Sequence, residues 1–174
     1  MRKRISRKGQ EVLGMSFGTI FSIILIVFFI VISFIVINAF LKTQRCAQIG
    51  IFTNNFKEII KTAFNAPSEE SEYTANLPSN LEYVCFTNLS EPISASSGED
   101  KKIADNIGIF SGEDANMVFY PREKACNIPY AKIDYLDIGR ITGLKNLRCF
   151  KIKDEKINIQ IKKGLSEKLV IIDG

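Results

Sequence analysis

The sequence predicts an α+β fold, in which a long N-terminal transmembrane helix continues into an amphipathic helix packed on an antiparallel β-sheet. Three observations support this prediction. Residues 12–41 contain no charged side chain, apolar residues then recur every three or four positions as far as Phe64, and the final third contains alternating strand patterns. The expected order is one membrane helix, one amphipathic helix, and a β-rich domain over residues 67–174.

The apolar segment is long enough to cross a membrane, and we place the transmembrane helix over residues 10–42. A hydrocarbon core about 30 Å thick requires about 20 apolar residues in a helix. The segment is longer than a secretory h-region, and no A-x-A-like cleavage site follows it. The three residues before Cys46 are too large and too polar for lipoprotein processing. The span is therefore expected to remain in the mature protein.

Basic side chains predict the orientation of this helix. Five of them precede the apolar segment, at Arg2, Lys3, Arg4, Arg7 and Lys8. The positive-inside rule then places the N-terminus in the cytoplasm and the C-terminal domain outside, as in a single-pass cell-membrane protein. Without these five residues, 18 basic side chains remain against 19 acidic ones. Composition therefore gives no support for nucleic-acid binding, and membrane lipid is the partner expected for the helix.

Residues 43–66 have the spacing of an amphipathic helix. Its apolar face comprises Ile49, Phe52, Phe56, Ile59, Ile60, Ala63 and Phe64. Pro67 is expected to end the helix, because proline disfavours the helical conformation in the residue before it. No strong breaker separates this segment from the apolar one, so we expect one continuous helix of about 50 residues, about 75 Å long.

The remaining chain has the pattern of a β-sheet with polar connections. Residues 67–80 are rich in Ser, Glu and Pro and are expected to form a connector. Five strands are predicted, over residues 81–87, 117–120, 146–153, 156–162 and 168–172. Asp154 and Glu155 are expected to form the turn of a hairpin. The segment 90–112 is expected to be a surface loop with one short helix near residues 102–107.

Four cysteines follow the apolar segment, on the side expected to be oxidising. They are Cys46, Cys85, Cys126 and Cys149. Two disulfides are expected on this ground, with free buried thiols as the alternative. No C-x-x-C pair is present, so neither a zinc site nor a redox motif is indicated. The spacing leaves all three possible pairings open.

The segment Lys8-Gly9-Gln10-Glu11 lies between the basic leader and the apolar helix. It resembles the processing site of archaeal type IV pilin precursors, which carry a class III signal peptide. The resemblance covers about the first 45 residues and the helix-then-sheet order of the chain. It implies that a prepilin peptidase removes the leader 1–9 after Gly9, that Gln10 becomes the first mature residue, and that Lys8 is the basic residue preferred before the glycine.

The resemblance also implies a function, namely a structural subunit of a cell-surface filament that self-associates through its N-terminal helix. Gly14 and Gly18 have the small-xxx-small spacing that permits close helix packing. One departure is Glu11, which would be the second mature residue, so the role of the acidic residue in bacterial pilins does not transfer to it. The alternative is an uncleaved single-pass anchor whose external domain binds a partner or serves as a scaffold.

Other functional classes find little support in the sequence. The chain contains no histidine, and adjacent acidic pairs lie in loop-like segments, so an enzyme, a cofactor site and a metal site are not expected. Asn88-Leu89-Ser90 matches the N-glycosylation pattern on the expected exported side. Asn88 is therefore a candidate glycosylation site. The residues do not indicate a ligand or a filament symmetry.

Overall fold

The computed structural model describes residues 17–95 and 97–174, with the side chain of Phe17 left aside. Lys8, Gly9 and Gln10 lie outside the described residues, as do the rest of the leader and Gly14. The chain divides into two compact units, which end and begin at Thr43 and Gln44. We call the second unit, Gln44–Gly174, the head domain.

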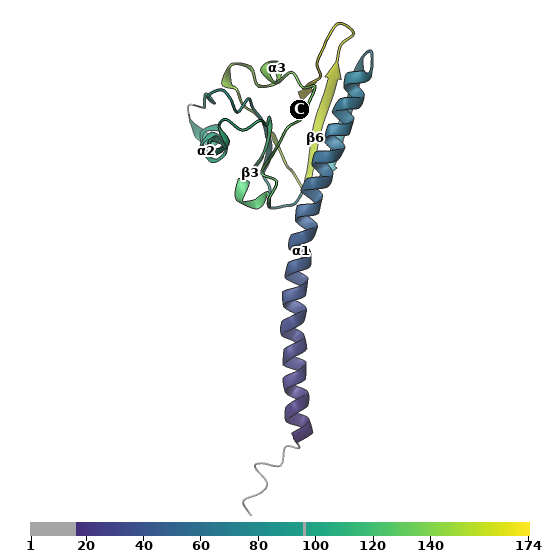
Figure 1. Cartoon of the computed structure of the whole chain (residues 1–174), viewed down its shortest axis with the longest axis vertical. Coiled ribbons are helices and arrows are strands. Elements are labelled where there is room, and N and C mark those ends of the chain that lie inside the picture. The colour runs from purple at the N-terminus through teal and green to yellow at the C-terminus, as the bar shows by residue number, and fades with distance from the viewer. Residues whose placement is uncertain (1–16, 96) are drawn as a thin grey trace, which may run out of the picture. The chain divides into compact units, whose positions relative to one another are not determined.

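The predicted continuous helix is confirmed (Figure 1). Helix α1 runs without interruption from Phe17 to Asn65, a length of 49 residues. It ends just before Pro67, as the proline predicts. Within the head domain, the predicted apolar face is buried at Ile49, Phe52, Phe56, Ile60 and Ala63, and partly buried at Ile59 and Phe64.

Two antiparallel sheets complete the α+β fold. The three-stranded sheet has the order β1-β6-β7, with β1 at Glu69–Asn76, β6 at Lys156–Lys163 and β7 at Ile171–Asp173. The four-stranded sheet has the order β4-β3-β2-β5, with β2 at Tyr83–Phe86, β3 at Met117–Tyr120, β4 at Tyr130–Ala131 and β5 at Arg148–Lys151.

Short helices connect these strands. Helix α2 spans Gly98–Ile107, and α3 spans Ile138–Thr142. Three 3-10 turns are η1 (Gly108–Phe110), η2 (Arg122–Lys124) and η3 (Gly143–Lys145). The helix expected near residues 102–107 is therefore present, and it begins four residues earlier. It buries Ile103 and Ile107, so the segment also contributes to the core.

The core has two parts, one on each face of the four-stranded sheet. The first lies among α1, β6 and this sheet, where Phe56 packs near Phe52, Tyr73 and Phe86 with ring centroids 5.6 to 5.8 Å apart. The second lies beneath α2 and contains Cys85, Ile103 and Val118. Since both faces are covered, all four residues of β2 are buried.

The connector predicted over residues 67–80 is wrong, because most of it is strand β1. Its alternation is regular, with exposed Glu70 and Glu72 on one side and partly buried Tyr73 on the other. Tyr73 pairs with Ile159 of β6 and its ring lies near Phe52 and Phe56. Cross-strand pairing and aromatic packing therefore outweigh the weak strand propensity of a Glu- and Ser-rich segment.

The hairpin between β5 and β6 follows the prediction. Ile157, Ile159 and Ile161 are buried, while Asn158 and Gln160 are exposed. Asp154 and Glu155 both have positive φ angles, 50° and 61°. Positive φ at both central residues is the requirement of a type I′ turn, whose twist matches that of paired strands. The last strand is shifted, since β7 begins three residues after the predicted start at Lys168.

A lysine from β6 caps the end of α1. The ammonium of Lys163 donates to the backbone oxygens of Phe64 and Ala66, the second at 2.7 Å, and lies 5.3 Å from the ring centroid of Phe64. A helix C-terminus leaves carbonyl groups unpaired and carries partial negative charge. Lys163 therefore pairs one of these carbonyls, that of Phe64, and places a positive charge at the negative end of the dipole of α1.

Replacing this cap is expected to destabilise the head domain. Lys163→Met keeps most of the side-chain volume but removes hydrogen bonds from a charged donor, so we expect a loss of about 1.5–3 kcal/mol of unfolding free energy. Urea unfolding of the full chain in detergent micelles measures this. The control is Lys162→Met, because Lys162 makes only an exposed 3.7 Å ion pair with Glu70 and should cost less than about 1 kcal/mol. Equal losses in the two variants would contradict the capping role.

Candidate functional site: the apolar helix and the disulfide-bonded head

The N-terminal part of α1 presents an apolar surface to its surroundings. The helix is apolar enough to cross a membrane, with a mean hydropathy of 3.4 over its most apolar window, and none of that window is buried. Large side chains such as Phe34, Ile35 and Phe40 are 63–66% exposed. A water-soluble protein rarely exposes an apolar surface of this extent, and such surfaces mark sites of membrane or protein interaction.

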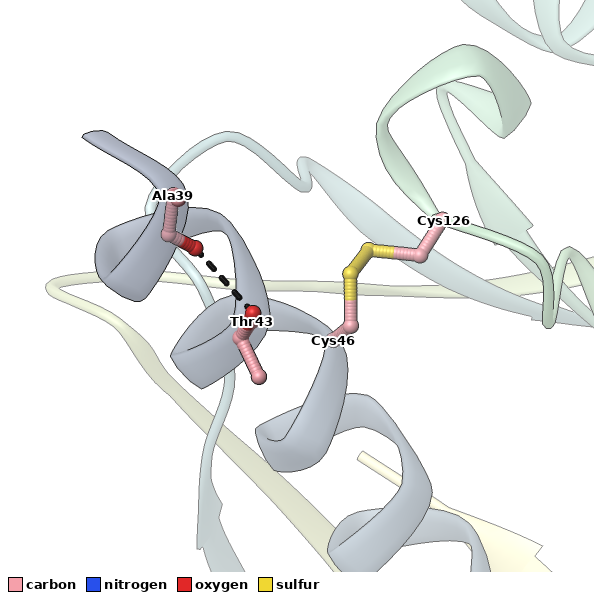
Figure 2. Close-up of a disulfide and its surroundings, with 4 residues drawn as sticks. All are labelled: Ala39, Thr43, Cys46 and Cys126. Atoms are coloured by element: carbon pink, nitrogen blue, oxygen red, sulfur yellow. Dashed lines mark hydrogen bonds between the residues drawn. A yellow bond between two sulfur atoms is a disulfide. The ribbon is translucent and has the colours of Figure 1, made fainter. Parts of the chain in front are cut away.

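Hydroxyl side chains in this region bond to the helix itself. Ser22 donates to the oxygen of Gly18 at 2.7 Å, Ser33 to that of Phe29 at 2.7 Å, and Thr43 to that of Ala39 at 3.0 Å (Figure 2). These i−4 bonds satisfy each hydroxyl without water. These three hydroxyl groups are thereby compatible with a hydrocarbon environment.

Asn38 is a polar residue that our sequence reasoning passed over. It is the single side-chain amide between Gly18 and Leu41, and its side chain is exposed on α1. An amide in hydrocarbon gains free energy by bonding to a polar group on a neighbouring helix. The signal was readable in the sequence, since asparagine is unfavourable in an apolar run without such a partner.

The expectation of two disulfides is confirmed, and the structure selects one of the three pairings. Cys46 of α1 bonds to Cys126, which follows η2, with their Cα atoms 5.7 Å apart (Figure 2). Cys85 of β2 bonds to Cys149 of β5, with a Cα separation of 4.0 Å. All four cysteines are in disulfides. Disulfides of this kind persist in oxidising compartments, which agrees with an extracytoplasmic head domain.

The pairing of Cys85 with Cys149 follows from the sheet register. The two residues are direct partners in the β2–β5 ladder. The backbone bond from Ile152 to Glu82 places the neighbouring Val84–Phe150 pair in a hydrogen-bonded position. Cys85 and Cys149 then form a non-hydrogen-bonded pair, where side chains approach most closely.

The candidate glycosylation residue lies in a turn after β2. Asn88 is partly buried; its amide donates to Glu91 at 2.8 Å and its oxygen accepts from the backbone of Ser90 at 3.1 Å. The backbone of Asn88 is bonded to the side chain of Asn146 through both its N–H and its oxygen, each at 2.8 Å. An attached glycan would replace the bond to Glu91. Glycan occupancy stays a prediction.

The ionisable groups with shifted pKa values include buried or partly buried tyrosines and surface carboxylates. Burial raises the pKa of the Tyr83 hydroxyl, and the nearby Glu99 carboxylate raises it further. The backbone N–H of Gly164 lowers the pKa of Glu167, and Arg140 adds to this shift. These arrangements stabilise local structure. Within residues 17–95 and 97–174, no group of three or more acidic or cysteine side chains is placed to hold a metal.

Most residues of the expected processing site and glycine pair lie outside the described part of the chain. Lys8, Gly9, Gln10 and Gly14 precede the described residues, and Gly18 lies in the first turns of α1. The described residues form a pilin-like architecture, with a long N-terminal apolar helix whose C-terminal part contacts antiparallel sheets. No protein family, curated protein or solved structure matches this chain.

Proposed function

We propose that this chain is a pilin-like structural subunit of a cell-surface filament, inserted in the membrane before assembly. The main support is the exposed apolar surface of α1 over residues 18–41, joined in one helix to a disulfide-bonded head domain. A subunit of this kind needs an apolar segment that lipid covers first and neighbouring helices cover later. Adhesion by the head domain is a further role that the family resemblance implies.

The proposed topology has the N-terminus in the cytoplasm and the head domain outside. The five basic residues of the leader favour this orientation through the positive-inside rule. The two disulfides favour an oxidising compartment for the head domain. Membrane lipid is then the first partner of α1.

Self-association of α1 is the second proposed contact. In the filament, helices of neighbouring copies would pack along residues 18–41 and replace lipid. Asn38 supplies a polar group that a neighbouring helix can bond, and Gly18 permits close approach of backbones. No cofactor, metal, nucleic acid or catalytic step enters this proposal.

Leader removal by a prepilin peptidase tests the proposal. We expect the native protein to begin at Gln10, and a Gly9→Val variant to keep its leader, because the peptidase of the family cuts after glycine. Intact-mass measurement of the protein from cells, with electron microscopy of the cell surface, records processing and filament formation. Removal of the leader also removes five positive charges that hold the N-terminus at the cytoplasmic surface.

The matched control is Ser6→Val, which introduces the same side chain three residues before the glycine and should still be processed. A native protein that retains Arg2–Lys8 would contradict the filament subunit and favour the alternative, an uncleaved single-pass anchor with an external binding or scaffold domain. A Gly9→Val chain that loses the mass of the leader, as the native chain is expected to, would likewise contradict processing at this position.

A further inference from the structure

The sheet order leaves two strands of the head domain with an open edge. Strand β1 ends the three-stranded sheet, and β5 ends the four-stranded sheet. The other two outer strands offer no comparable edge. Strand β4 has only two residues. The outer side of β7 is covered at its start, where residues 135–137 bond to Val170. Among the described residues, no strand pairs with the second side of β1. On the second side of β5, residues 148–151 are also unpaired, and the chain's own β6 first closes this side at Lys153, which pairs with Lys156.

The open edges present unpaired backbone groups at defined residues. In an antiparallel pair, backbone groups alternate between facing the partner and facing away. Leu77 bonds to Glu155, so in β1 the residues Glu70, Glu72, Thr74 and Asn76 direct their backbone groups outward. By the same alternation, Cys149 and Lys151 of β5 direct theirs away from β2. Such edges are templates for pairing with another strand.

The two edges carry opposite charge. Strand β1 contains three glutamates and no basic residue. The open side of β5 borders a cleft lined by three lysines, Lys151, Lys153 and Lys156, and by one acidic residue, Asp154. Asn158 of β6 and the C-terminal Gly174 of the same chain line its other side. Within the described part of the chain, Lys153, Lys156 and Glu72 form no ion pair, while Lys151 lies 5.7 Å from the ring centroid of Tyr83.

The spacing of the charges also matches. Glu70 and Glu72 are two residues apart and exposed, as are Lys151, the last residue of β5, and Lys153, whose backbone is bonded to Lys156 but whose side chain is exposed. Residues two apart on a strand lie about 7 Å from each other on the same face, so the two pairs have the same repeat. Pairing of β1 with β1, or β5 with β5, would instead oppose like charges.

We propose that β5 of one chain pairs with β1 of a second copy, with the lysines of the first facing the glutamates of the second. Because the two surfaces differ, this contact is heterologous and leaves one edge free on each outer copy, as a growing filament requires. The inference relies on the proposed function only in that copies lie side by side. It adds a contact between head domains to the contact between helices.

Zero-length cross-linking of the full chain tests this contact. Isotopically light and heavy chains are mixed in lipid vesicles and treated with a carbodiimide, which joins amines to carboxylates in direct contact. We expect light–heavy peptides that link Lys151 or Lys153 to Glu70 or Glu72. The pair Lys162–Glu70, 3.7 Å apart within one chain, should give a cross-link without isotope mixing and is the internal control.

Charge-reversal variants distinguish a specific contact between the two edges from cross-linking by random collision of chains. Lys151→Glu with Lys153→Glu should lower the light–heavy yield about tenfold, because like charges then face each other. Adding Glu70→Lys and Glu72→Lys to the same chain should restore the light–heavy yield. The cross-links would then join the new lysines at positions 70 and 72 to the new glutamates at positions 151 and 153. The control is Lys101→Glu with Lys102→Glu on the exposed side of α2, which should leave the yield unchanged. All these side chains are exposed, so the variants are expected to fold.

Each outcome bears on one proposal. Cross-links confined to single chains, or a yield that the four-residue exchange does not restore, overturn the edge pairing; the charges then serve to keep each edge unpaired. If the leader is removed and filaments form without these cross-links, the proposed function stands and the edge pairing fails. If the cross-links form but the native protein keeps its leader, the filament subunit fails and the edge pairing stands.

Discussion

A variant with Cys46→Ser and Cys126→Ser is expected to lose about 4 kcal/mol of unfolding free energy, because the bond closes a chain segment with a sequence separation of 80 residues. The cross-link restricts the unfolded chain, and its removal returns that conformational entropy. Urea unfolding of the full chain in detergent micelles, without reductant, measures the loss. A decrease below about 1 kcal/mol would contradict this account.

A second readout locates the effect. Cys46 lies on α1 next to Ile49, and its partner Cys126 lies in the segment between β3 and β4. Without the bond, we expect faster amide hydrogen exchange in residues 44–50 than in the native protein. The β2–β5 ladder still has the Cys85–Cys149 bond and should keep its protection. Equal acceleration in both regions would indicate global destabilisation alone.

Phe56→Ala is expected to cost about 3–5 kcal/mol of unfolding free energy, because it leaves a cavity at the centre of the core. Phe56 is fully buried, and its ring lies within 6 Å of those of Phe52, Tyr73 and Phe86. These neighbours come from α1, β1 and β2, so the residue joins the helix to both sheets. Thermal and urea unfolding of the full chain measure the loss.

Ile51→Ala is the matched control for this substitution. Ile51 lies on the same helix within the head domain, but 59% of it is exposed. Removing an exposed apolar side chain should change the unfolding free energy by about 0.5 kcal/mol or less. A comparable loss in both variants would contradict the assignment of the Phe56 face as the core of the head domain.

Elements whose buried residues repeat with the period of a helix or strand were predictable from the sequence. The apolar face from Ile49 to Ala63 and the alternation of Ile157, Ile159 and Ile161 each repeat with the period of their element. The turn at Asp154 and Glu155 is local and was also predictable. In each case the information lies within a few residues of the element itself.

Strand β1 was not predictable, because its own residues favour a loop. Glu69–Asn76 forms a strand only because Ile159 and its neighbours offer a paired edge and because Tyr73 packs against the helix. Helix α2 was predicted too short for a related reason, since the start at Gly98 precedes its first buried residue, Ile103. Weak local signals were decided by distant contacts.

Some features of the candidate site were likewise readable in the sequence, and others depend on the folded structure. The apolar surface of α1 and the single amide within it, Asn38, were readable from the sequence. The cysteines were readable as disulfide candidates, but their pairing depends on the register of β2 with β5 and on the position of Cys126 beside α1. The open edges of β1 and β5 exist only in the assembled sheets.

The sequence by itself determined the membrane-competent helix, its continuation to Asn65 and the α+β class, because hydrophobic periodicity records the environment of each residue along one element. Only the tertiary structure decided that a Glu-rich segment is a strand, which cysteines are joined, and which strands remain unpaired. These properties depend on residues that are 64 to 94 positions apart and meet only when the chain folds, so no local pattern encodes them.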